Sequence, residues 1–187
     1  MRVRLIVLDR DGVINRDSDA FIKTPAEWLP QDGSLQAIAL LTQHGFTVAV
    51  ATNQSGIGRG LLNRETLYAI HRKMRRAVAH AGGSIGRIVY CPHRPDDHCD
   101  CRKPATGQLE RLARYYGVPM HGVPVVGDAL RDVEAATALG ARPILVLTGK
   151  GRQTRNALNA QGKAVETYAD LLAAARQLVS ENPGLAD

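Results

Sequence analysis

The sequence is poor in aromatic residues and cysteine, and it has no long hydrophobic run. Aromatic residues make up 4% of its 187 residues, and three residues are cysteine. An odd number of cysteines cannot form a complete disulfide framework. No apolar stretch approaches the roughly 20 residues of a membrane-spanning helix, and the first apolar run is too short for a signal peptide. We therefore expect a globular, cytoplasmic protein with no membrane partner.

Positive charge is in excess, with 24 basic against 18 acidic residues and a net charge of +6. Such a balance favours an anionic partner, either a phosphorylated metabolite or a nucleic acid. The densest basic run, at residues 71–76, lies in an expected helix and has no interleaved aromatic residues to stack on bases. We expect a small phosphorylated substrate and no nucleic acid.

Short apolar segments alternate with segments of helical periodicity along the chain. Five apolar segments are typical of buried strands: residues 3–8, 46–51, 87–90, 123–126 and 143–147. Helical periodicity follows Ser34, with Ser34 or Asp32 as the expected cap, and ends at Gly45. Further helices are expected at residues 64–81, 108–116 and 132–139, and from Tyr168 to Val179.

This alternation predicts an α/β fold with a doubly wound, mostly parallel sheet and helices on both faces. We expect one domain over residues 1–187, since no linker divides the chain. Residues 15–30 lack periodicity and predict a long loop, a kind of segment that is often functional. No insertion of domain size separates the strands, so we expect no large cap domain over the site.

Polar residues gather at the predicted strand ends. Asp9 and Asp11 follow the first strand, Thr52 the second and Asp128 the fourth, while Lys103 precedes a helix. Ligands of open parallel sheets bind beyond the carboxyl ends of the strands. Mg²⁺ prefers hard carboxylate oxygens. Asp9 and Asp128 are therefore candidate magnesium ligands at this edge.

Each of these residue types suits a step of phosphoryl transfer. A carboxylate beside a cation stays ionised, so Asp9 can attack phosphorus. Asp11 can protonate the leaving oxygen and later deprotonate a water molecule. Thr52 can hydrogen-bond the phosphoryl oxygens, and Lys103 can neutralise charge on Asp9 and the phosphoryl group.

The motifs LDRDGVIN, ATNQSG, CRKP and GDALRD resemble the four motifs of the haloacid-dehalogenase-type phosphatases. The resemblance covers the chain to about Gly149. It implies magnesium-dependent phosphomonoester hydrolysis through an aspartyl-phosphate on Asp9. It also implies that the backbone carbonyl of Asp11 and the carboxylate of Asp128 complete the magnesium site, with Asp132 in support.

A second metal site is expected in the loop of residues 91–101, which contains every cysteine of the chain. Three thiolates and one imidazole fill a tetrahedral zinc site, which makes such a zinc ion structural. The expected ligands are Cys91, His93, Cys99 and Cys101, with His98 as the alternative to His93. Arg102 and Lys103 follow directly, so a bound zinc ion would hold both cations near the phosphate site.

The zinc loop narrows the resemblance to the branch that contains the heptose bisphosphate phosphatases and the histidinol-phosphate phosphatases. Resemblance to the heptose bisphosphate phosphatases implies removal of the 7-phosphate of a heptose 1,7-bisphosphate, a step toward lipopolysaccharide. Histidinol-phosphate phosphatase activity remains the alternative. The expected substrate contacts are Asp17, Asn53, Gln54, Ser55 and Arg102. Ala129 stands where the heptose branch often has Lys, and Arg131 is a candidate replacement.

Two other classes share part of the pattern. A phospho-receiver domain also gathers carboxylates, Thr and Lys at strand ends, but it lacks an acid/base residue two positions after the phosphorylated Asp. A nucleic-acid-binding zinc protein fits the charge and the cysteines and leaves the carboxylates unexplained. We expect a monomer, because an open site needs no partner to close it.

Overall fold

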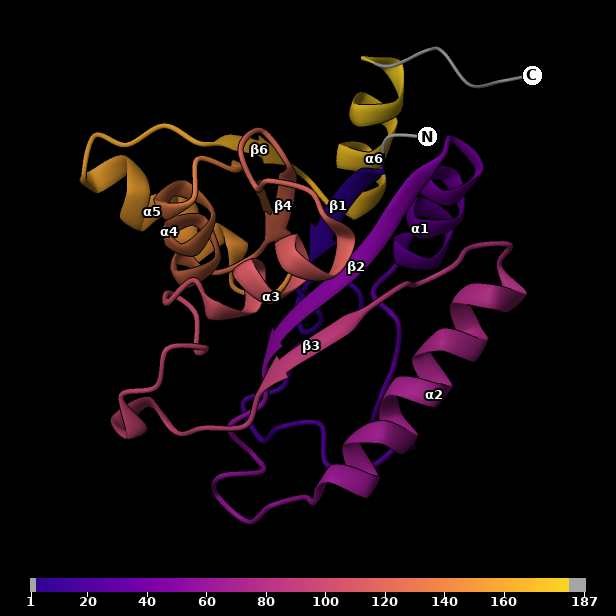
Figure 1. Ribbon diagram of the computed structural model, residues 1–187, viewed down its shortest axis with the longest axis vertical. Coiled ribbons are helices and arrows are strands. Elements are labelled where there is room, and N and C mark those ends of the chain that lie inside the picture. Colours follow the sequence, from indigo (N-terminus) through magenta and orange to yellow (C-terminus); the bar gives the residue numbers. More distant parts are fainter. Residues whose placement is uncertain (1–2, 182–187) are drawn as a thin grey trace.

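The computed structural model describes residues 3–181, and within them six parallel strands form one sheet in the order β3-β2-β1-β4-β5-β6 (Figure 1). The strands are β1 (Arg4–Leu8), β2 (Phe46–Asn53), β3 (Ile88–Cys91), β4 (Pro124–Gly127), β5 (Arg142–Val146) and β6 (Glu166–Tyr168). The parallel, doubly wound sheet predicted from the sequence is confirmed.

Helices cover both faces of this sheet (Figure 1). They are α1 (Ser34–Gln43), α2 (Arg64–His80), α3 (Gly107–Tyr116), α4 (Leu130–Ala138), α5 (Gly151–Ala160) and α6 (Leu171–Ser180). Buried side chains of α1, α2 and α6 form one core with one face of the sheet, and those of α3 and α4 form a second core on the other face. Because crossover helices shield both faces, the central strands β1 and β4 are mostly apolar.

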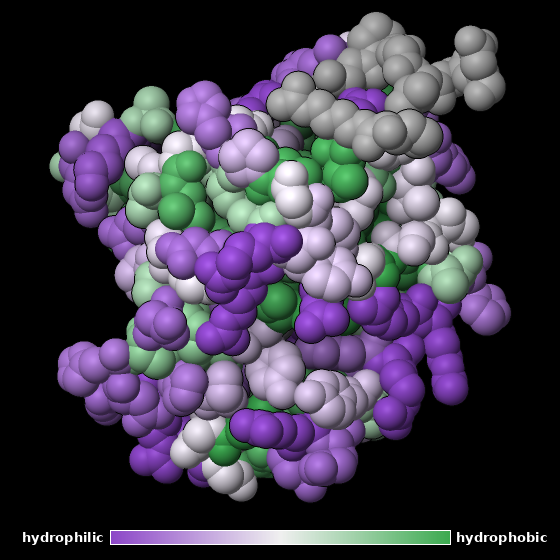
Figure 2. All heavy atoms as spheres, in the orientation of Figure 1, coloured by the Kyte–Doolittle hydropathy of each residue, from purple (hydrophilic) through white to green (hydrophobic). Residues whose placement is uncertain are grey.

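Strand β1 shows how the sequence creates two cores. Ile6 and Leu8 point into the core under α1 and α2, whereas Leu5 and Val7 point into the core under α3 and α4. Each buried aliphatic side chain of this size contributes about 1.5–3 kcal/mol. On the face drawn in Figure 2, exposed hydrophobic side chains form only small, separated patches among hydrophilic ones.

Helix α2 carries one buried histidine into the region of the site. Asn63 caps the helix, and its side-chain oxygen accepts a bond from the Thr66 N–H at 2.8 Å. Apolar residues spaced three and four apart turn one face of the helix inward. His71 lies on that inward face with 6% of its surface exposed.

The predicted cap of α1 is wrong. Gly33 occupies the cap position with a φ of 77°, and neither Asp32 nor Ser34 caps the helix through its side chain. Ser34 is instead the first helical residue, and its hydroxyl donates to the Ile14 carbonyl at 2.6 Å. That bond fastens the residue before the long loop of residues 15–30 to the start of α1, and no local sequence pattern indicates it.

The C-terminal third differs most from the prediction. Helix α5 and strand β6 were not anticipated, and Tyr168 ends β6 rather than belonging to the last helix. Helix α6 begins at Leu171, after Asp170 accepts a hydrogen bond from the Ala173 N–H at 2.8 Å. The polar sequence of α5 and the three-residue length of β6 hide both elements from a periodicity argument.

Between β1 and β2 the chain forms only the loop and α1, so no inserted domain covers this edge of the sheet. No helix within residues 3–181 is long and apolar enough to cross a membrane.

Candidate active site

Three buried carboxylates meet at the carboxyl ends of β1 and β4. These strands are neighbours, with Leu8 in register with Val126, so Asp9 and Asp128 emerge side by side. Asp132 lies in the first turn of α4. One oxygen from each of the three carboxylates lies within 4.8 Å of the other two. The strand order alone brings Asp9 next to Asp128, more than a hundred positions later in the sequence.

The electrostatics of this cluster suit a divalent cation. Burial, with added repulsion from Asp132, raises the pKa of Asp9 from 3.8 to about 6 despite the attraction of Lys103. Burial and then the charges of Asp9 and Asp132 raise the pKa of Asp128 to about 7. The Oδ1 atom of Asp128 is buried without a hydrogen-bond partner. Crowded hard oxygens with one free acceptor fit Mg²⁺.

Lys103 supplies a fixed positive charge to the cluster. Its Nζ lies 3.1 Å from Asp9 Oδ1 and 2.6 Å from Asp132 Oδ1, and it donates to the Ala51 carbonyl at 2.7 Å. Burial works against the ammonium, but the charges of Asp132 and Asp9 outweigh it and raise the pKa of Lys103. With 3% of its side chain exposed, this lysine is part of the cluster and not of the surface.

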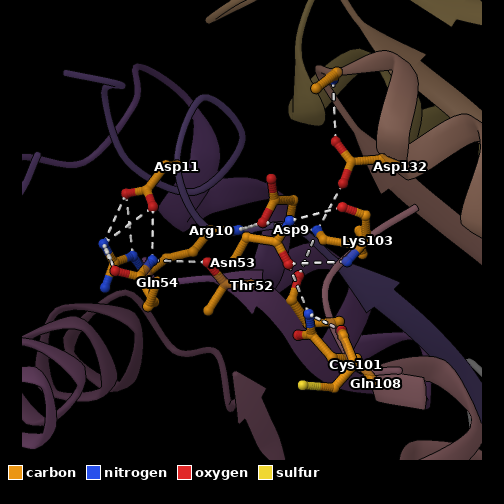
Figure 3. A network of polar contacts seen from close by, with 12 residues as sticks. Asp9, Arg10, Asp11, Thr52, Asn53, Gln54, Cys101, Lys103, Gln108 and Asp132 are labelled. Atoms are coloured by element: carbon orange, nitrogen blue, oxygen red, sulfur yellow. Dashed lines mark hydrogen bonds and ion pairs between the residues drawn. The ribbon is translucent and has the colours of Figure 1, made fainter. Parts of the chain in front are cut away.

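Asn53 holds the Lys103 segment in place (Figure 3). Its side-chain nitrogen donates to the Lys103 carbonyl at 3.0 Å, and its oxygen accepts from the Lys103 N–H at 3.1 Å. Gln108 donates to the same oxygen at 2.9 Å and also to the Cys101 carbonyl. The sequence predicted a substrate contact for Asn53. In the structure its side-chain amide forms hydrogen bonds with the main chain of Lys103.

Asp11 points away from Asp9 into a group of hydrogen-bond donors (Figure 3). Arg10 donates to both carboxylate oxygens at 2.9–3.1 Å, and Asn15 and Gln54 donate at 2.9 and 2.8 Å. Burial alone would raise the pKa of Asp11, but the Arg10 charge and these bonds hold it below its usual value. Gln54 also donates to the Thr52 hydroxyl at 2.9 Å, so it connects two predicted site residues.

Arg10 and His71 were not anticipated as members of the site. Arg10 is fully buried, and its Nη1 lies 3.4 Å from His71 Nε2. Arginine can only donate, so this ring nitrogen is the acceptor and the imidazole is neutral. Burial, followed by the Arg10 charge, lowers the pKa of His71 from 6.5 to about 3.

The buried neutral histidine predicts a loss of stability in mild acid. The folded pKa lies below the unfolded value, so the unfolded chain binds the additional proton as pH falls below about 6.5. The stability contributed by neutral His71 is fully present above pH 6.5 and is lost progressively as the pH falls toward 3. Between pH 7 and 5 we expect wild type to lose about 2 kcal/mol more than His71→Gln, which keeps an acceptor for Arg10. Urea unfolding at both pH values measures this, and equal losses in the two proteins would contradict it.

A cavity of about 240 Å³ opens beside Asp11. Its lining includes all five of the predicted substrate contacts: Asp17, Asn53, Gln54, Ser55 and Arg102. Sequence reasoning assigned no role to Arg59 and Lys150, which also line it, and named Arg131 without placing it. Burial, the charge of Arg131 and the charge of Arg59 are among the causes that lower the pKa of Arg102. Four arginines line this cavity, and together with Lys150 they outnumber its three carboxylates, which favours an anionic occupant.

The cysteine-rich loop forms a compact cluster at the end of β3. One atom from each of four side chains lies within 4.8 Å of the others: Cys91, His93, Cys99 and Cys101. His93 Nδ1 lies 3.5 Å from Cys91 Sγ and 3.3 Å from Cys101 Sγ. His98 is exposed and is not a member. The donor set of three sulfurs and one imidazole suits a tetrahedral metal site.

Comparison with known proteins identifies the family. The family model for HAD-hydrolase-like proteins matches residues 100–175. The D-glycero-beta-D-manno-heptose-1,7-bisphosphate 7-phosphatase of Bordetella bronchiseptica is 54% identical over 182 residues, which cover 96% of this chain and 99% of the relative. The chain belongs to the haloacid-dehalogenase-type phosphatases.

Other members of these phosphatases extend the likeness. The Escherichia coli K12 protein of the same name is 36% identical and aligns with 90% of this chain and 92% of its own. A crystal structure of the Bordetella bronchiseptica heptose bisphosphate phosphatase, complexed with magnesium and phosphate, superposes with a TM-score of 0.91 and covers 96% of this chain and 99% of that chain. This phosphatase therefore shares its fold with that structure over nearly its whole length.

Proposed function

We propose that this phosphatase removes the 7-phosphate of D-glycero-beta-D-manno-heptose 1,7-bisphosphate. The observation that carries the proposal is the buried cluster of Asp9, Asp128 and Lys103 beside a small cationic cavity. The relatives that bear this name match nearly the whole chain. A bisphosphate also suits the cavity, because a second phosphate needs cations beyond those of the reacting centre.

Asp9 acts as the nucleophile in this scheme. One of its carboxylate oxygens bonds to phosphorus as the ester oxygen of the sugar leaves and takes a proton from Asp11. The dianionic phosphoryl group beside Asp11 favours its protonated form, since like charges raise a carboxyl pKa. Water then attacks the aspartyl-phosphate, gives its proton to Asp11 and releases phosphate with Asp9 free again. The Arg10, Asn15 and Gln54 bonds suit the ionised form that this second step requires.

Mg²⁺ would be held by the carboxylates of Asp9 and Asp128 and the backbone carbonyl of Asp11, and it would neutralise charge on the phosphoryl group. Asp132 supports the site through its bonds to Lys103 and to the Ala129 N–H. Thr52 and Lys103 would contact the phosphoryl oxygens.

A structural Zn²⁺ would occupy the cluster of Cys91, His93, Cys99 and Cys101. Its role would be mechanical, because a filled tetrahedral shell leaves no open position for substrate. Cys101 is followed directly by Arg102 and Lys103, so a fixed Cys101 restricts both cations.

The sugar would contact Asp17 and Ser55, and Arg102 would bind the phosphate that is not cleaved. Arg131 lines the same cavity and would supply the positive charge that Ala129 lacks. Gln54 would contribute to the substrate site mainly by orienting Asp11 and Thr52, to which its side chain donates hydrogen bonds.

The substrate proposal is tested by phosphate release in Mg²⁺ from the heptose bisphosphate and from histidinol phosphate. We expect a much higher kcat/KM for the bisphosphate, because Arg102 and its neighbouring guanidinium groups have a second anion to bind. Histidinol phosphatase activity is the less favoured alternative, since the relatives that match 94–96% of this chain bear the heptose bisphosphate name. Faster release from histidinol phosphate would overturn the substrate and leave the chemistry of Asp9 intact.

A further inference from the structure

The turn between β5 and α5 is bonded to both catalytic loops, although it belongs to none of the four motifs. The Thr148 hydroxyl donates to the Gly12 carbonyl at 2.6 Å. The Lys150 N–H donates to Asp128 Oδ2 at 2.8 Å. The Thr154 hydroxyl donates to the Asp128 carbonyl at 2.8 Å. The position of Asp128 therefore depends on this turn and on Thr154, in the first turn of α5.

Glycine permits this close approach. Gly149 has a φ of +52°, and a Cβ atom there would lie 2.2 Å from Asp128 Oδ2 and 2.6 Å from the Cα of Gly12. Such distances exclude a side chain, because both opposing groups are held by the bonds just described. The main chain of the turn thus lies directly against the metal-binding loops.

The side chain of Lys150 extends from the same turn to the loop of residues 17–22, which we call the substrate loop. Its Nζ lies 3.5 Å from Asp17 Oδ2 and 3.5 Å from Asp19 Oδ1. Asp17 is partly buried, with 24% of its side chain exposed, and lines the cavity together with Lys150. The Asp19 carboxylate is 96% exposed, so its pair with Lys150 contributes little.

We propose that Lys150 is a positioning residue that fixes the substrate loop against the metal centre. Its main chain holds Asp128, and its ammonium holds Asp17, so a single residue joins the metal centre to the substrate loop. A loop that is already ordered loses less conformational entropy when substrate binds. A substrate that contacts the loop therefore binds more tightly. The inference rests on the proposed function only in that the heptose substrate must extend to Asp17.

Lys150→Met tests the side chain alone, because the main-chain bond to Asp128 remains. In magnesium-loaded protein without substrate, we expect amide hydrogen exchange in residues 17–22 to rise about two- to fivefold, because the Lys150 side chain is 45% exposed and its pair with Asp17 is partly screened. We expect a similar rise in KM for the heptose bisphosphate, with little change in KM for para-nitrophenyl phosphate or in the magnesium concentration for half activation. Lys150→Arg should restore most of the loss. Lys163→Met, at an exposed lysine just beyond the end of α5, should change neither the exchange nor the KM.

Unchanged exchange in residues 17–22 would overturn the inference, as would an equal rise in KM for both substrates. If the wild type releases phosphate from para-nitrophenyl phosphate and not from the heptose bisphosphate, the proposed substrate fails. The exchange measurement still decides the role of Lys150 in that case, because it contains no substrate.

Discussion

Asp9→Asn is expected to lower kcat by about four orders of magnitude or more while leaving the protein at least as stable as wild type. The amide cannot attack phosphorus, and this accounts for the loss of turnover. The Asp9 pKa is raised in the folded state from 3.8 to about 6. A raised pKa means that the ionised carboxylate opposes folding above pH 6. The neutral amide removes that opposition.

The size of the stability gain follows from the pKa shift. A shift of two units corresponds to at most about 3 kcal/mol, so at pH 8 without magnesium we expect a gain of about 1–3 kcal/mol. Urea unfolding in magnesium-free buffer measures the gain. Asp96→Asn, at an exposed position, is the matched control and should change neither activity nor stability. A large destabilisation by Asp9→Asn would mean that Asp9 acts mainly through structure.

Cys101→Ser is expected to remove bound zinc and to lower kcat about 10- to 100-fold. Losses of this size are typical when residues that orient a metal site are changed. Cys101 is 1% exposed, and its carbonyl accepts a bond from Gln108, which also holds Asn53. Without the metal, this loop loses its strongest restraint, and Lys103 is held near Asp9 only by its own ion pairs and by Asn53. Zinc content by elemental analysis and steady-state kinetics on the same preparation measure both effects.

His98→Ala is the matched control for the zinc prediction. His98 lies in the same loop and is exposed, outside the cluster of four donors. It should retain zinc and activity. Loss of zinc from Cys101→Ser with unchanged turnover in a folded protein would contradict the view that the metal positions Arg102 and Lys103.

The geometry of the proposed reacting centre could be predicted because Asp9 and Asp128 follow strands and Thr52 lies near the end of β2. A parallel sheet places the carboxyl ends of its strands at one edge, so Asp9, Thr52 and Asp128 had to lie near one another once the strands were identified. Lys103 was harder to place, since it follows a loop. Its position depends on Asn53 and Gln108, two contacts that no spacing in the sequence reveals.

The substrate side of the site could be predicted only in part. Arg10 stands between Asp9 and Asp11 in the sequence, yet its burial against His71 depends on how α2 packs, which periodicity does not specify. Lys150 lies beyond the last motif, and its contact with Asp17 joins segments more than 130 residues apart. Tertiary contacts of this kind leave no local pattern, apart from the glycines on either side of Lys150.

The central claim is that phosphoryl transfer proceeds in two steps through Asp9. The stereochemical course at phosphorus tests it most directly, using a heptose bisphosphate whose 7-phosphoryl group is made chiral with oxygen isotopes and sulfur. Two successive in-line displacements, first by Asp9 and then by water, predict net retention of configuration in the released thiophosphate. Net inversion would show a single displacement by water and would contradict the aspartyl-phosphate.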